Sequence, residues 1–200
     1  MTPRRRALAW GLVVGSLMLV ALIVWGPSRA VEELVRPDPP APAASDDAPA
    51  APTAQITATL FYGSSDGQAL VPVRREVPLA ADVVTQGRQI LDAQLAPPPD
   101  EHVSVIPPGT TLRAFFVTPR GDAFVDLSPE VTTAHPGGSL TELLTVYAIV
   151  NAITANLPAV RQVQILVDGR EVDTIAGHVD VRRPLTRERS LVIEAPAGER

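Results

Sequence analysis

Three histidines are the side chains of this sequence best suited to metal binding or proton transfer, and their spacing predicts no site. His102, His135 and His178 lie far apart, in or near predicted loops, and none belongs to a metal-binding pattern such as HxxxH. We interpret them as surface or locally hydrogen-bonded residues. His178 and Asp180 could place an imidazole beside a carboxylate, but no nucleophile accompanies them, so no catalytic triad is predicted.

The carboxylates Asp122 and Asp126 share one face of a predicted strand. Four residues of strand separate them by about 13 Å, which is too far for the acid and nucleophile of a glycosidase. We predict a structural role for Asp126, with a hydrogen bond to the backbone near Ser128, because Asp-x-Ser-Pro is typical of a turn. Ser139 follows two glycines, but GxSxG is absent, so we interpret Ser139 as a helix cap.

The composition argues against several further classes of function. The chain has 200 residues, no cysteine and a formal net charge of −5, and its 17 basic residues are all arginine. Without cysteine, disulfides, thiolate metal ligands, thiol catalysis and lipid attachment to a cysteine are excluded for this chain. No phosphate-binding loop occurs, and after the amino-terminal arginines the basic residues cluster only at 182–189, so nucleic acid is not an expected partner. We therefore predict no catalytic residue, no cofactor and no metal site.

The amino-terminal segment has the pattern of a membrane anchor. An arginine cluster at 4–6 precedes an uncharged apolar run at 7–25, with a tryptophan near each end. Such a run is about long enough to cross a bilayer as a helix and longer than the apolar region of a typical signal peptide. Within residues 1–30 we expect an uncleaved single-pass transmembrane helix in the cytoplasmic membrane, with a cytoplasmic N-terminus and an extracytoplasmic C-terminal domain. Residues 31–54, rich in proline and alanine, are predicted to be a disordered linker.

Alternating apolar residues and turn signals predict one folded domain over 55–185, followed by a tail at 186–200. The expected order is β-β-α-β-β-α-β-β, an α+β fold in which two helices cover one face of a mostly antiparallel sheet. Gly87, in the middle of the first helix, predicts close packing against that sheet. Asp168 and Gly169 predict the turn of the last hairpin.

The second predicted helix lies within residues 137–158. Ser139 is predicted to be its N-cap, with Glu142 completing a capping box, and Pro158 ends it. The apolar arc of this helix is much wider than the stripe of an ordinary surface helix, so it must be covered on more than one side.

Two sets of residues on this helix are candidates for a role. Val146, Ile149 and Ile153 lie toward one edge of the arc and form a candidate interface with a partner. Asn151 and Thr154 lie inside the arc and are candidate structural polar residues, because a buried polar group needs a hydrogen-bond partner. For Asn151 we expect a loop carbonyl.

The order of several short motifs resembles one family. The chain is similar to the GerMN domain family of bacterial spore germination and sporulation proteins over about residues 55–185. The resemblance implies an extracytoplasmic, non-catalytic domain used in envelope assemblies. The chain departs from the family pattern in carrying one copy rather than two and an anchor without a lipobox cysteine. The matching motifs are Leu60-Phe61-Tyr62, Ile106 to Thr110, Ala123 to Ser128, Gly138-Ser139, Ile149 to Thr154 and Val163 to Gly169.

We expect a membrane-anchored interaction or assembly module whose partner is an envelope protein or a second copy of the chain. An alternative is a domain that binds peptidoglycan or a small ligand through the loops at 95–110 and 127–138, beside a helix N-terminus. A third hypothesis is an envelope hydrolase that uses Asp126 and His178.

The anchor makes a prediction about the mass of the mature protein. Because the apolar run is expected to stay in the membrane, intact-mass spectrometry of the protein from its native membrane should find a chain that includes residues 7–25. A mature protein that begins near Val31 would show that this segment is a cleaved signal peptide.

Overall fold

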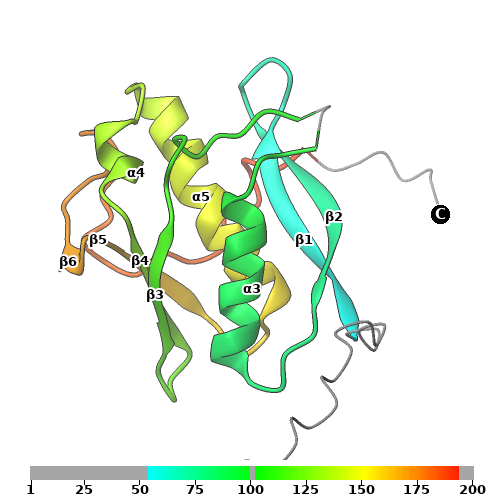
Figure 1. Cartoon of the computed structure of the whole chain (residues 1–200). Coiled ribbons are helices and arrows are strands. Elements are labelled where there is room, and N and C mark those ends of the chain that lie inside the picture. Colours follow the sequence, from blue (N-terminus) through cyan, green and yellow to red (C-terminus); the bar gives the residue numbers. More distant parts are fainter. Residues whose placement is uncertain (1–53, 100–101, 194–200) are drawn as a thin grey trace, which may run out of the picture. The chain divides into compact units, whose positions relative to one another are not determined.

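A computed structural model describes residues 54–99 and 102–193 (Figure 1). The predicted anchor within 1–30, nearly all of the predicted linker and residues 194–200 lie outside this range, so these remain predictions. No helix in the described part of the chain is both long and apolar enough to cross a membrane. The elements are β1 Gln55–Gly63, β2 Leu70–Pro78, α3 Val83–Leu95, β3 Leu112–Val117, β4 Asp122–Leu127, α4 Glu130–Thr133, α5 Ser139–Asn156, β5 Gln162–Val167 and β6 Arg170–Glu171.

The α+β class is confirmed, and the element order matches the predicted one with the short helix α4 added. The predicted single sheet is corrected, because the strands form two sheets. β1 and β2 make an antiparallel hairpin, and the second sheet has the order β3-β4-β5-β6. β4 and β5 are parallel, while the other pairs are antiparallel. β4 and β5 can run parallel because α5 lies between them in the chain. It carries the chain from the carboxyl end of β4 back to the edge of the sheet where β4 starts.

The helices α3 and α5 contact each other and lie between the two sheets (Figure 1). α5 contacts β1 on one side and β5 on the other, and α3 contacts β3 as well as the hairpin. The prediction that both helices cover one face of one sheet is therefore also corrected. This arrangement covers α5 from several directions, which explains why its apolar arc is so wide.

The candidate interface on α5 is part of the core. Val146, Ile149 and Ile153 each have 0% of their surface exposed. Their side chains are covered by the chain itself, so they offer no surface to a partner in this conformation. The physical reason is that α5 packs against strands of both sheets and against α3, rather than against one sheet.

The end of the described chain belongs to the folded domain. Asp168 and Gly169 form the predicted turn between β5 and β6, both with positive φ, 52° and 76°. Beyond it, Leu185 bridges to Val163, and Val192 bridges to Leu70 on the hairpin. Part of the segment predicted to be a tail, up to residue 193, therefore packs on the domain.

The ring of Phe115 explains why a glycine stands at position 87, in the middle of α3. A Cβ added at position 87 would overlap this ring, which lies directly against the helix backbone. Phe115 is itself buried in the core, 1% exposed. The predicted close approach of helix α3 to the sheet is confirmed at β3.

Replacing Gly87 with alanine should therefore destabilise the domain. Alanine favours an α-helix by about 1 kcal/mol over glycine, but the overlap with Phe115 costs more, and we expect a net loss of about 1–3 kcal/mol in the free energy of unfolding. Chemical denaturation measures the difference. The double variant Gly87→Ala, Phe115→Leu should lose less than the two single variants together, and strict additivity would contradict this explanation.

Candidate functional site

The most unusual polar group of the described residues is the carboxylate of Glu142, in the first turn of α5. The N-cap of α5 is Gly138, at a φ of 90°, and no side chain caps the helix. Ser139 is thus the first helical residue rather than the cap, and the predicted capping box does not form. Glu142 is fully buried, at 0% exposure.

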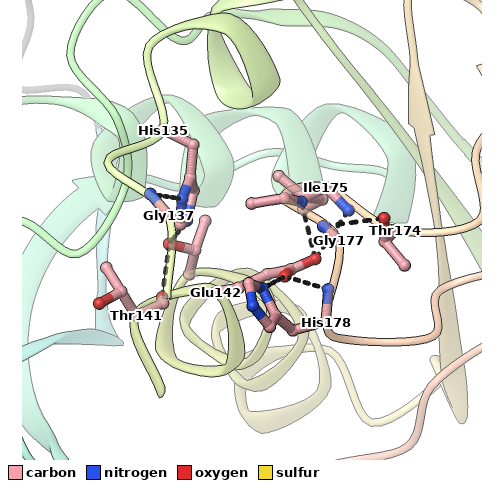
Figure 2. Close-up of polar contacts among 10 residues, drawn as sticks. His135, Gly137, Thr141, Glu142, Thr174, Ile175, Gly177 and His178 are labelled. Atoms are coloured by element: carbon pink, nitrogen blue, oxygen red, sulfur yellow. Dashed lines mark hydrogen bonds and ion pairs between the residues drawn. The ribbon is translucent and has the colours of Figure 1, made fainter. Parts of the chain in front are cut away.

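The carboxylate of Glu142 is held by the backbone of the segment that follows β6 (Figure 2). Oε1 accepts hydrogen bonds from the N–H groups of Ile175 at 2.9 Å and Ala176 at 2.8 Å. Oε2 accepts from the N–H of His178 at 2.7 Å, and the His178 ring Nδ1 lies 3.2 Å from the same oxygen. Converging N–H groups of this kind form a site for an anion, and here the chain fills that site itself.

Two opposing effects set the pKa of Glu142. Burial raises the pKa, because a charge loses its hydration, whereas hydrogen bonds from the backbone of residues 175, 176, 178 and 179 lower it. The hydrogen bonds outweigh burial, and the net pKa lies below the ordinary value of 4.5. Glu142 is therefore ionised at neutral pH and acts as an acceptor.

His135 lies beside this cluster and is held in one tautomer. Its Nδ1 accepts a hydrogen bond from the N–H of Gly137 at 2.9 Å, so the ring proton is on Nε2, 3.2 Å from the Thr145 hydroxyl oxygen. The Thr145 hydroxyl in turn donates to backbone carbonyls, among them that of Val105. The pKa of His135 is lowered, chiefly because burial disfavours the charged ring. The negative charge of Glu142 raises this pKa and the nearby His178 lowers it, both by smaller amounts. These contacts join the α4–α5 loop to the body of α5.

The two aspartates of β4 have separate partners. Asp126 accepts from the N–H of Gly169 at 2.8 Å and from Nε of Arg113 at 3.3 Å. Arg113 also pairs with Asp168 at 2.8 Å. Asp126 is thus a structural acceptor, but its backbone partner is in the β5–β6 turn rather than near Ser128, because the parallel strand β5 brings that turn beside it.

Asp122 has its own partner, the Gln162 side chain, which donates to it at 2.7 Å. The Asp180 carboxylate pairs with Arg182 at 2.7 Å, and the His178 ring with Glu142. Hydrogen bonds and the charge of Arg182 lower the pKa of Asp180 to about 2. The sequence neighbours His178 and Asp180 are therefore engaged with different partners.

The two polar candidates on α5 have local partners. The Asn151 amide donates to the carbonyl of Glu188 at 2.8 Å and accepts from the N–H of the same residue at 2.9 Å. This fastens the carboxyl-terminal segment to the helix through a loop carbonyl, the kind of partner expected for Asn151. The Thr154 hydroxyl donates to the carbonyl of Val150, one turn earlier, at 2.7 Å.

Glu142 and His135 form a cluster that sequence reasoning missed. The hydrogen bonds of Glu142 join it to residues 33 or more positions away, and both of its carboxylate oxygens already have donors. Within residues 54–99 and 102–193, no group of three or more His, Cys, Asp or Glu residues could hold a metal ion. A charged residue inside an apolar helix is a usable signal for such a site, but three residues after a serine it also fits a capping box.

The family follows from a comparison with known proteins. The family model described as "Germane: Sporulation and spore germination" matches residues 59–173, more than half of the chain. The chain belongs to this family. The resemblance to GerMN domains drawn from the sequence motifs is thereby confirmed.

Solved structures of GerMN domains are similar in fold to this chain. The first GerMN domain of the sporulation protein GerM from Bacillus subtilis matches with a TM-score of 0.50 and 19% identity, over 68% of this chain and 98% of that one. The tandem GerMN domains of the same protein match with a TM-score of 0.52 and 16% identity, over 66% of this chain and 46% of the tandem protein. A candidate lipoprotein from Clostridium perfringens matches with a TM-score of 0.48 and 24% identity, over 66% and 87% of the two chains. No curated protein matches the chain.

Glu142→Gln tests the role of the buried carboxylate. Glutamine keeps the shape but directs an amide NH2 group toward backbone donors, so at pH 7 we expect a loss of about 2–4 kcal/mol in the free energy of unfolding. Glu171→Gln, at an exposed residue of β6, is the control and should change it by less than about 0.5 kcal/mol.

The difference should also depend on pH. The folded-state pKa of Glu142 is lowered, so the unfolded chain takes up the proton first as the pH falls. The stabilisation is complete above the ordinary value of 4.5 and is lost as the pH falls through the folded-state pKa. Denaturation curves at several pH values should therefore converge for wild type and Glu142→Gln in acid. A constant difference would contradict the assignment.

Proposed function

We propose that this GerMN protein acts without catalysis, as an interaction and assembly module of the cell envelope. In this proposal the segment at 7–25 anchors it in the cytoplasmic membrane, and the linker at 31–54 holds the folded domain away from the membrane on the extracytoplasmic side. The Bacillus subtilis relative is a sporulation protein, and a role in an envelope assembly suits that family.

The observation that carries the proposal is the exposed aromatic side chain of Phe116, on the edge strand β3. Phe116 is 60% exposed. It lies beside Phe124 on the neighbouring strand, on the sheet face opposite the buried Phe115. Aromatic side chains are enriched in protein interfaces, and an exposed edge strand offers unpaired backbone groups.

The polar cluster supports a non-catalytic role. Both oxygens of Glu142 accept backbone hydrogen bonds, and His135 is engaged at both ring nitrogens. A general base needs a free lone pair within reach of a substrate proton, and Glu142 is fully buried. The cluster is better suited to holding segments together.

A photo-crosslinking amino acid at position 116 tests this function in living cells. We expect a discrete crosslinked product in the envelope fraction, and none from the same substitution at Ser65, which is exposed in the turn between β1 and β2. Products from both positions would indicate random collisions. The proposal would lose its basis if neither position gave a product and the purified chain cleaved peptidoglycan.

A further inference from the structure

The loop between α4 and α5, residues 134–138, is held by one side chain. Pro136 has no N–H group, and Gly137 and Gly138 have φ values of 85° and 90°, which only glycine adopts easily. Among the described residues, the one hydrogen bond that an N–H group of 136–138 donates goes from Gly137 to the His135 ring, at 2.9 Å (Figure 2). The imidazole therefore takes the place of a backbone partner for this loop.

The other ring nitrogen of His135 joins the loop to two further segments. Nε2 lies 3.2 Å from the hydroxyl oxygen of Thr145, which is 0% exposed. That hydroxyl donates to the carbonyls of Val105, in the connection between α3 and β3, and of Thr141 in α5. Because its proton is directed to these carbonyls, the oxygen has only lone pairs left for the ring, and Nε2 must be the donor.

Both contacts of His135 require a neutral imidazole. With the proton on Nε2, the lone pair of Nδ1 accepts from the N–H of Gly137. A second proton on Nδ1 would set two N–H groups against each other across the same 2.9 Å, and a hydrogen bond would become a repulsive contact. The attachment of the loop to the ring is therefore incompatible with the charged form of His135.

We propose that His135 is a pH-sensitive switch, in which protonation of the ring releases the 134–138 loop from α5 and deprotonation fastens it again. Histidine is the side chain whose ordinary titration lies between about pH 5 and 8, so mild acid is enough. The switch does not involve Phe116. It therefore goes beyond the proposed interaction function and does not depend on it.

Two titratable groups act on the His135 ring from the elements around it. Glu142 of α5 favours the charged ring and His178, in the segment after β6, disfavours it. Both effects are smaller than that of burial, so the pKa of His135 in the folded chain lies below the ordinary value of 6.5. In α4, the carboxylate of Glu130 is engaged by the side chain of Ser128. The closed loop thus resists a proton that the open loop accepts.

The sign of the pH dependence follows from this difference. As the pH falls, the open loop takes up the proton first, so the stabilisation by neutral His135 is complete above 6.5 and is lost as the pH falls through the folded-state pKa. The pKa of Glu142 lies below 4.5, so its own contribution is lost only in stronger acid. The loop is therefore released while Glu142 still holds the segment after β6.

Nuclear magnetic resonance of the full chain in detergent, labelled with 15N, tests the switch directly. We expect the His135 ring to carry its proton on Nε2 at neutral pH and to titrate below 6.5, and the amide resonance of Gly137 to move with the same midpoint. Protection of this amide from hydrogen exchange should fall at least about threefold between about pH 7.5 and 5.5. A ring with its proton on Nδ1, or a Gly137 resonance that does not follow the titration, would overturn the proposal.

Two variants separate the charge of the ring from its contact. In His135→Asn the side-chain oxygen can accept from Gly137 but takes up no proton, so the Gly137 resonance should stay constant over this pH range. Phenylalanine has no acceptor, so in His135→Phe the Gly137 resonance should resemble, at neutral pH, that of wild type in acid. A Gly137 resonance that still follows the pH in His135→Asn would refute the switch.

His178→Gln is the matched control, because His178 is the other histidine beside Glu142. The Gly137 resonance should still follow the pH in this variant, with the pKa of His135 slightly higher because His178 lowers it. Loss of the response would assign the titration to His178 and rule out His135 as the switch.

The melting temperature gives a second measurement. Between about pH 7.5 and 5.5 it should fall for wild type relative to His135→Asn, because only wild type loses the stabilisation by a neutral ring. Glu142 stays ionised in this range and does not contribute to the difference. A constant difference between the two chains would contradict the inference, whether or not a partner is found at position 116.

Discussion

The buried carboxylate of Glu142 is the contact on which the carboxyl-terminal part of the domain depends. Residues 172–181 have no helix or strand of their own, and three of their N–H groups meet this one side chain. An unpaired buried charge would be very unfavourable, and the same N–H groups would be unfavourable if left without an acceptor. Each partner therefore makes burial of the other tolerable, and α5 and this segment are fixed relative to each other.

The same principle recurs along α5, where side chains take the role of missing backbone partners. Asn151 holds the carbonyl and N–H of Glu188, and Asn156 closes the edge of β1. A helix between two sheets must bury apolar residues on several sides, and its few polar residues are placed where the neighbouring backbone has unpaired groups.

For a member of the GerMN family, these features support the proposed role as an assembly module. The polar groups that could do chemistry, Glu142 and His135, are engaged in holding segments of the chain together. What faces outward at β3 is backbone and the ring of Phe116, 60% exposed. The anchor proposed for residues 7–25 would add to the effect of such an exposed side chain, because proteins held to one membrane meet at a high effective concentration.

The sequence by itself determined the class, the order of the elements, the turn at Asp168 and Gly169, the tight contact at Gly87 and the family. All of these depend on local patterns: alternation, turn residues, a glycine inside a helix, and motifs in order. Only the tertiary structure decided that the strands form two sheets, that Val146 and its neighbours are buried on every side, and that Glu142 bonds a segment 33 residues away instead of capping its own helix. Burial and hydrogen-bond partners depend on which segments meet in space. Local patterns in one amino-acid sequence do not show which distant segments come together.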